Sequence, residues 1–364
     1  MFNKTQSIII SKTVGSIEEM CLSILSQAEK KNALRISFFC KTSNNNEYRE
    51  NISAIKALVC EAFNDCKPVV SYIAQGSSTG RLAAEVTYLT DNAASIERHN
   101  DYIIIKSNST KEIITGGIIP HDISLSTFQQ ATEVFATIGA MLKENGFKPS
   151  DIYRQWNYIE GITSLNNGSQ NYQEFNDARS HFYNSCEWSN GYPAATGIGT
   201  ETGGVMIELN AATGVKNNDK PINNPVQIAA HSYSQNVLEG KTSEGFSERT
   251  TPKFERARLL GDTIYFSGTA AIKGEESNTS DCIIEQTSMT MSIIDRLIAQ
   301  DNIPVPNNGA SYNILRIYVK NSTDIPAVEE YMQEHYPSVP KHCLIGDICR
   351  PELLIEIEGT AHVK

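Results

Sequence analysis

The chain has 364 residues, enough for two or three domains, and its 40% hydrophobic and 20% charged residues are ordinary for a globular protein. Its formal net charge of -11 argues against a nucleic-acid surface, because phosphate binding needs a basic stripe. The charge leaves room for a small anionic substrate, since a few arginines in a cleft are enough to hold one.

The cysteines and histidines give no sign of a metal site. The eight cysteines include no Cys-x-x-Cys pair, and several lie in apolar stretches where a reduced thiol packs as a small hydrophobe. The seven histidines lack ligand spacings such as His-x-x-x-His. The apolar run 8–10 is too short for a signal peptide or a membrane span. We therefore expect a cytoplasmic protein with free thiols, no metal, no cofactor and no membrane or nucleic-acid partner.

Three segments of the chain repeat one order of elements, which is helix, strand, helix, strand, strand. The first segment begins with a helix from Ser16 to about Lys30, and Ser16 with Glu19 forms a capping-box pattern at its start. Apolar spacing then predicts the other elements of this segment: a strand at 34–39, a helix at 48–63, a strand after Pro68 and a strand at 82–89.

The second and third segments follow the same order. The second is expected to contain a helix at 126–144, a strand at 152–159, a helix at 171–185, a strand after Pro193 and a strand at 204–209. The third is expected to contain a helix at 281–300, a strand at 313–319, a helix at 325–335, a strand after Pro340 and a strand at 353–361. Hairpins are expected before these two segments, at 102–105 with 118–119 and at 258–266.

Matching residues support a true triplication. A proline opens the penultimate strand of each segment, a place where strands tolerate it: Pro68, Pro193 and Pro340. A glutamate lies inside each last strand: Glu85, Glu208 and Glu356. The same order of elements occurs in unrelated α+β proteins, so these matches carry the inference. We predict an α+β fold of three β-α-β-α-β-β units at 1–95, 96–220 and 221–364. The polar connection 217–249 is either a functional lid or a linker.

The last strand carries two carboxylates on one face. By the two-residue period, Leu354, Glu356 and Glu358 share one face, and Leu353, Ile355 and Ile357 share the other. Like charges so close raise at least one pKa, which suits a general acid. The alternative is an exposed strand face with solvated glutamates.

The third segment resembles the RidA/YjgF superfamily. The resemblance rests on 264–270, the long helix that follows, and the closing stretch 349–358. It implies units that assemble as a trimer with sites between neighbours. It also implies an arginine before the last strand that holds a substrate carboxylate, and Arg350 occupies this place.

The whole chain is more similar to the chorismatases, which carry a RidA-like C-terminal part behind a related N-terminal region. The stretches that carry this resemblance are 154–159, 172–179, 192–199, 224–227, 254–257, 267–272 and 349–358. The chain departs from the family pattern at Ile162-Thr163, at Ala271 and at Tyr233-Ser234. These departures concern the substrate pocket. The resemblance implies three RidA/YjgF-like units packed as a pseudo-trimer within a monomer.

The resemblance also implies the chemistry. Cleaving the enol ether of chorismate needs a proton on the terminal methylene carbon, and Glu356 matches the family's acid. Glu358 shares its face, is expected to raise its pKa, and is the first alternative as the acid. The substrate carboxylates need cationic forks, and the candidate substrate-binding residues are Arg154, Arg179, Tyr233, Arg256, Gly268 and Arg350. The alternative for each arginine is a structural or surface role, and the alternative for Tyr233 is a packing role.

Cys349 is the candidate for product choice. The resemblance places a cysteine here in the subgroup that forms 3-hydroxybenzoate by an intramolecular route, and otherwise Cys349 is a buried filler. The sequence thus predicts a chorismatase that releases pyruvate and either 3-hydroxybenzoate, which is favoured, or a dihydroxycyclohexadiene carboxylate. The rivals are an imine or enamine deaminase of the RidA kind, which would release ammonia, and a non-catalytic aromatic-acid-binding protein, which would bind without turnover.

Overall fold

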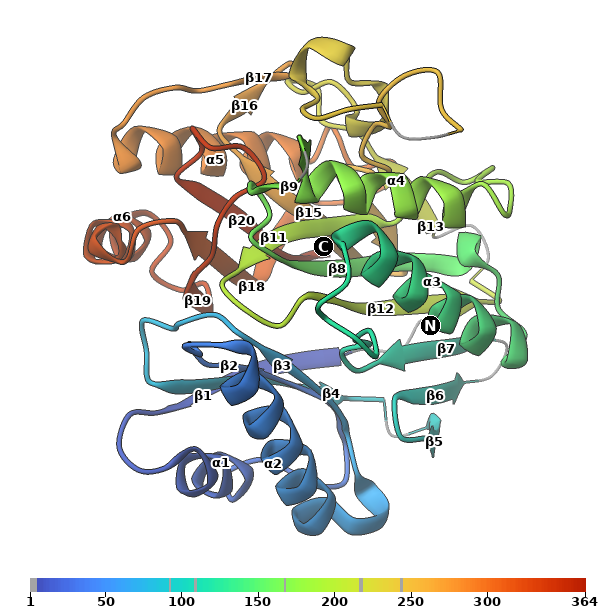
Figure 1. Cartoon of the computed structure of the whole chain (residues 1–364), viewed down its shortest axis with the longest axis vertical. Coiled ribbons are helices and arrows are strands. Elements are labelled where there is room, and N and C mark those ends of the chain that lie inside the picture. The colour runs from blue at the N-terminus through green and yellow to red at the C-terminus, as the bar shows by residue number, and fades with distance from the viewer. Residues whose placement is uncertain (1–4, 92, 108–109, 167, 216–218, 243–244) are drawn as a thin grey trace.

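The computed structural model describes residues 5–91, 93–107, 110–166, 168–215, 219–242 and 245–364 (Figure 1). The fold is α+β, as predicted. Three mixed sheets each carry two helices on one face, and the opposite faces of the sheets turn toward the interior.

The first sheet has the strand order β1-β4-β2-β3. Its strands are β1 (Thr5–Lys12), β2 (Ala33–Phe39), β3 (Val69–Ile73) and β4 (Leu82–Leu89). Helices α1 (Ile17–Leu25) and α2 (Asn45–Phe63) cover it. The Ser16 hydroxyl and the Glu19 carboxylate form the predicted capping box at the start of α1.

The second sheet has the order β11-β8-β12-β7-β6-β5. Its strands are β5 (Ser95–Arg98), β6 (Tyr102–Ser107), β7 (Thr110–Thr115), β8 (Ile152–Glu160), β11 (Ala194–Thr200) and β12 (Val205–Thr213). Helices α3 (Thr127–Glu144) and α4 (Asn171–Tyr183) cover it. The two-residue strands β9 (Leu165–Asn166) and β10 (Ser169–Gln170) form a hairpin just before α4.

The third sheet has the order β13-β14-β15-β20-β18-β19. Its strands are β13 (Asp219–Ile222), β14 (Ala257–Leu260), β15 (Thr263–Ala270), β18 (Ala310–Val319), β19 (Lys341–Ile345) and β20 (Ile355–Val363). Helices α5 (Ile283–Leu297) and α6 (Ile325–His335) cover it. The short strands β16 (Ile272–Lys273) and β17 (Glu276–Ser277) form a separate hairpin.

The three sheets share a three-strand arrangement. In each, the strand after the first helix pairs in parallel with the strand after the second helix and antiparallel with the last strand. The parallel partners β3, β11 and β19 begin directly after Pro68, Pro193 and Pro340, as predicted.

Two element predictions were wrong, and the strands not predicted are β1, β5 and β13 and the two-residue strands β9, β10, β16 and β17. The second strand of the first hairpin is β7 rather than 118–119, and Ile118 instead makes an isolated bridge to Ile207. Helix α1 ends at Leu25 because the backbone then tightens, and the Gln27 N–H donates to the Ile24 carbonyl at 3.0 Å. Strand β1, which contains the isoleucine run, was not predicted.

The inner faces of the sheets are polar and charged because successive residues of a strand point to opposite sides. In β20, for example, Ile355 and Ile357 pack in the apolar core beneath α5, while Glu356 and Glu358 face inward. The same alternation places an inward arginine on β2, β8 and β18 and an inward glutamate on each last strand. These inner faces provide the charged residues of the interior.

Three buried ion pairs connect the sheets in a cycle. Each joins an arginine of one sheet to a glutamate on the last strand of the next sheet. The pairs are Arg35–Glu208 at 3.9 Å, Arg154–Glu358, and Arg316–Glu85 at 2.7 Å. We call these six residues the central ion-pair ring. Arg316 also lies 3.7 Å from Glu208 and 3.5 Å from Glu358. The six side chains are at most 8% exposed, so each charge depends on an oppositely charged partner.

The eight cysteines all lie in the described ranges and are free thiols. No helix in those ranges is both long and apolar enough to cross a membrane.

Candidate active site

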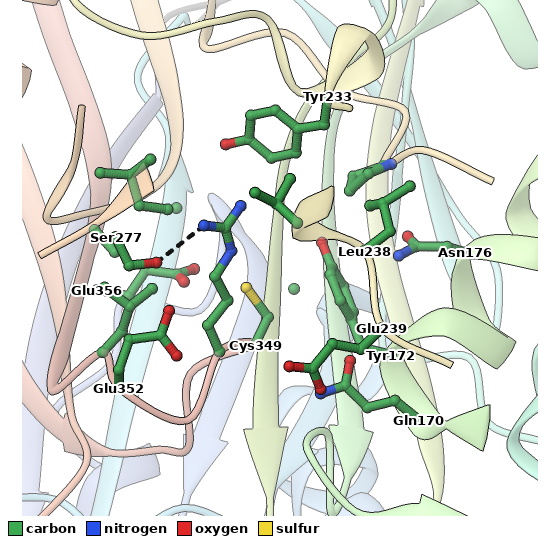
Figure 2. A pocket seen from close by; sticks show the side chains of 18 of the residues that line it. Gln170, Tyr172, Asn176, Tyr233, Leu238, Glu239, Ser277, Cys349, Glu352 and Glu356 are labelled. Carbon is green, nitrogen blue, oxygen red and sulfur yellow. Dashed lines mark hydrogen bonds between the residues drawn. The ribbon is translucent and has the colours of Figure 1, made fainter. Parts of the chain in front are cut away.

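A cavity of about 350 Å³ lies between the second and third sheets. Its walls come from the start of α4, from β11, from β15 and from the corner that leads into β20. Figure 2 shows Cys349 near the centre of this cavity, with Tyr172 on one side and Glu356 on the other. Its volume falls within the range of about 300 to 1,000 Å³ that is typical of small-molecule sites.

Glu356 is the buried carboxyl group of this cavity. It is 5% exposed and faces Gly268 on β15, where a Cβ atom would collide with the Glu356 Oε1 atom. Burial raises the pKa of the Glu356 carboxyl to about 8, and the positive charge of Arg154 partly opposes this rise. The carboxyl is therefore protonated at neutral pH. Burial, rather than the predicted repulsion from Glu358, is the main cause.

Cys349 and Arg350 lie on the corner before β20. Burial raises the pKa of the Cys349 thiol to about 12, so this side chain is a neutral thiol. Arg350 donates to the Glu275 carbonyl at 2.8 Å and to the Ser277 hydroxyl at 2.9 Å (Figure 2). Its guanidinium lies over the Tyr233 ring, 5.3 Å from the centroid. These contacts fix a cation at the cavity wall.

A second cation, Arg256, also contacts Tyr233, with its guanidinium 5.4 Å from the ring centroid. It is 4% exposed and donates to the Tyr233 hydroxyl at 2.7 Å. Its Nε has no hydrogen-bond partner among the described residues, although it is buried. An unpaired buried donor on a cavity wall is costly, so an acceptor on a bound molecule would relieve it.

The structure places three of the predicted site residues away from the cavity lining. Arg179 lies within α4, bonded to the Asn176 side chain and over the Phe175 ring at 5.4 Å. Arg154 and Glu358 line a second cavity of about 70 Å³ and belong to the central ion-pair ring. Glu358 also accepts from the Tyr318 hydroxyl at 2.7 Å. Glu358 is therefore an ion-pair and hydrogen-bond partner of other buried side chains.

Several residues that line the cavity were not predicted. They come from the start of α4 and from the polar connection before β14: Gln170, Tyr172, Gln173, Asn176, Asn236, Val237, Leu238 and Glu239. Burial raises the pKa of the Tyr172 hydroxyl, so it stays protonated. Residues 236–239 of the connection that was predicted to be a lid or a linker line the cavity, and its residues 217–218 and 243–244 lie outside the described ranges. The stretch 172–179 signalled α4, but not which of its side chains reach the cavity.

Comparisons with known proteins show the family to which the chain is similar. Residues 88–211 match a family model described as "Chorismatase FkbO/Hyg5-like, N-terminal". A 3-hydroxybenzoate synthase of Streptomyces hygroscopicus is 30% identical over 242 residues, which cover 64% of this chain and 69% of that protein. The chain belongs to the chorismatase family.

Two further relatives support this membership. A chorismatase of Streptomyces rapamycinicus is 30% identical over 241 residues, covering 63% of this chain and 67% of that protein. A crystal structure of a chorismatase covers 98% of both chains with a TM-score of 0.71 and 17% identity, so it has the same fold. Glu356, Arg256 and Arg350 are charged residues among those that line the cavity.

Proposed function

We propose that the chain is a chorismatase that protonates and cleaves the enolpyruvyl ether of chorismate, releasing pyruvate and a hydroxylated ring acid. The carrying observation is the Glu356 carboxyl, which is buried against the cavity and holds its proton at neutral pH. A neutral carboxylic acid is the donor that carbon protonation of an enol ether requires.

The steps balance without a cofactor. The Glu356 proton goes to the terminal methylene carbon, and the ether carbon becomes an oxocarbenium ion. An oxygen nucleophile then adds to that carbon, and its proton restores the Glu356 carboxyl. The bond between that carbon and the ring ether oxygen then breaks, which releases pyruvate and leaves the oxygen on the ring acid. Chorismate contains all the atoms of pyruvate and 3-hydroxybenzoate, so the intramolecular route adds no water. The route to the dihydroxycyclohexadiene carboxylate adds one water molecule. General-acid help of this kind is typically worth about 10² to 10⁴ in rate.

Arg256 and Arg350 are the proposed partners of the substrate carboxylates. Both line the cavity, both flank Tyr233, and Arg256 has an unpaired buried Nε. Charge-assisted bonds of this type contribute about 1.5 to 3 kcal/mol each. The Tyr233 hydroxyl adds a polar group, and Gly268 lets the substrate approach the acid because no side chain stands between them.

Cys349 is proposed to favour 3-hydroxybenzoate. Its neutral thiol lies in the cavity near Glu356, and a thiol holds water poorly. The relative named 3-hydroxybenzoate synthase supports the same choice.

The proposed architecture is three units, at 1–95, 96–220 and 221–364, packed as a pseudo-trimer in a monomer. The shared strand arrangement and the cyclic order of the three ion pairs support it. Light scattering of the purified chain tests the monomer. A cytoplasmic location, where thiols stay reduced, remains part of the proposal.

The decisive experiment is incubation of the purified protein with chorismate, followed by enzymatic assay of pyruvate and mass analysis of the ring product. Pyruvate formed together with 3-hydroxybenzoate supports the proposal. Binding without pyruvate would indicate a non-catalytic protein. Ammonia from an amino-acid-derived imine, with chorismate left intact, would indicate a deaminase.

A further inference from the structure

Two glutamates on one face of β20 have opposite surroundings. Among the described residues, none donates a hydrogen bond to the Glu356 side chain. Glu358, two residues further on, receives bonds from five side chains: Arg154, Trp156 at 3.0 Å, Thr196, Tyr318 at 2.7 Å and Arg316 at 3.5 Å. Glu358 is 1% exposed. A carboxylate that accepts so many donors is held in its charged form.

Arg154 links these two carboxyl groups. Its guanidinium bonds to Glu358 and, at 2.8 Å, to the Thr196 hydroxyl. That hydroxyl also accepts the Gly268 N–H at 3.1 Å, and Gly268 is the residue that faces the Glu356 carboxyl. Arg154 is 1% exposed, and its charge is felt at Glu356. A buried cation beside an acid favours loss of the acid's proton.

We propose that Glu358 is a positioning residue that holds Arg154 in an ion pair and thereby keeps Glu356 a neutral proton donor. The negative charge of Glu358 has two effects, and both keep the pKa of Glu356 high. Glu358 offsets the positive charge of Arg154, and its own negative charge opposes ionisation of Glu356. The inference rests on the proposed function for its catalytic meaning, but the charge state of Glu356 is measurable without any substrate.

The other charged and titratable groups that line the cavity with Glu356 are unchanged in every variant of the test. They come from α4, from the segments before β14, from β17 and from the corner before β20: Tyr172, Tyr233, Glu239, Arg256, Glu276, Cys349, Arg350 and Glu352. Burial raises the pKa of the Cys349 thiol to about 12 and that of the Tyr172 hydroxyl further still, so both stay neutral during the test. Arg256 and Arg350 stay charged and are present in every variant.

The test is a charge cycle with three variants: Glu358→Gln, Arg154→Met and the double variant. The pH dependence of pyruvate release from chorismate gives the basic limb of kcat for each. Glu358→Gln is expected to move the limb down by about one pH unit, because a nearby opposite charge lowers a carboxyl pKa by about 1 to 3 units. Arg154→Met is expected to move it up, and the double variant to return it toward the wild type. KM for chorismate is expected to change little, whereas the pH of the basic limb of kcat shifts.

Tyr318→Phe is the matched control, since it removes one hydrogen bond to Glu358 but keeps its charge. Its limb is expected to stay in place. A structural role for Glu358 would instead lower kcat at all pH values with the limb unmoved, and this outcome overturns the proposal. So do shifts of the two single variants in the same direction.

Folding and substrate identity are kept separate from the test. Removing one partner of a buried ion pair is costly, whereas removing both is often tolerated. If Glu358→Gln does not fold, the limb of the double variant must lie below that of Arg154→Met. If chorismate is not turned over, the pKa of Glu356 is measured from stability instead. The unfolding free energy of each variant is followed against pH and compared with that of the same variant carrying Glu356→Gln. Opposite shifts of the Glu356 pKa in Glu358→Gln and Arg154→Met again support the proposal, and the same Glu356 pKa in all variants overturns it.

Discussion

The raised pKa of Glu356 predicts a specific dependence of stability on pH. The carboxyl titrates at about 8 in the folded protein and near its ordinary value of 4.5 when the chain is unfolded. Because the pKa is higher in the folded protein than in the unfolded chain, the contribution of protonated Glu356 to the unfolding free energy is fully present below pH 4.5. This contribution is lost as the pH rises through 8. The wild type is therefore expected to lose stability across this window relative to Glu356→Gln, which has no titrating group.

The magnitude follows from the two pKa values. Each pH unit between them is worth about 1.36 kcal/mol, which bounds the total loss at about 5 kcal/mol. Between pH 5 and pH 8 we expect the unfolding free energy of the wild type to fall by about 2 to 4 kcal/mol relative to that of Glu356→Gln. Above pH 8 the difference should become constant.

Urea unfolding at pH 5, 6, 7, 8 and 9, followed by tryptophan fluorescence, measures this difference. Glu352→Gln is the matched control, because it removes an exposed glutamate at the same cavity and keeps the Glu356 carboxyl. Parallel curves for the wild type and Glu356→Gln would refute the reasoning, since they would mean that the buried carboxyl titrates as it does in the unfolded chain.

The remaining predictions concern catalysis. Glu356→Gln keeps the shape of the acid without its proton, and pyruvate release should fall by about 10² or more while far-ultraviolet circular dichroism stays unchanged. Cys349→Ala makes room for a water molecule, so the ring product should shift from 3-hydroxybenzoate toward the dihydroxycyclohexadiene carboxylate; identical products in heavy-oxygen water would make the cysteine a packing residue only. Gly268→Ala puts a Cβ atom against the Glu356 carboxyl, so pyruvate release should fall at least tenfold with a loss of about 1 to 3 kcal/mol in unfolding free energy. Arg350→Met should raise KM for chorismate by about tenfold or more, and an unchanged KM would remove Arg350 from the substrate.

The sequence predicted what local patterns determine. Period-two alternation placed Glu356 and Glu358 on one face of the last strand, and prolines marked the starts of β3, β11 and β19. Apolar spacing gave α6 with the bounds that the structure shows.

Sequence patterns left open what depends on distant partners. Glu358 appeared equivalent to Glu356, but its ion-pair partner Arg154 is 204 residues away in the chain. No local pattern specifies such a pairing, so the different roles of the two glutamates emerged only from the packing of three sheets. The entry of Tyr172 into the cavity has the same origin. The strand β1 was missed because its isoleucines are only partly buried and follow no clean alternation.

The central ion-pair ring has a consequence for how the chain comes apart. Each sheet contributes one arginine and one glutamate to different neighbours, and removing the third sheet leaves the buried charges of Glu85 and Arg154 without their ion-pair partners. Each stranded charge costs about 3 to 5 kcal/mol, a sum comparable to the whole stability of a typical protein, about 5 to 15 kcal/mol. Loss of the third sheet should therefore carry the other two with it. Although the chain has the length of several domains, it should melt in a single cooperative transition, and no third of it should persist as a folded fragment after proteolysis.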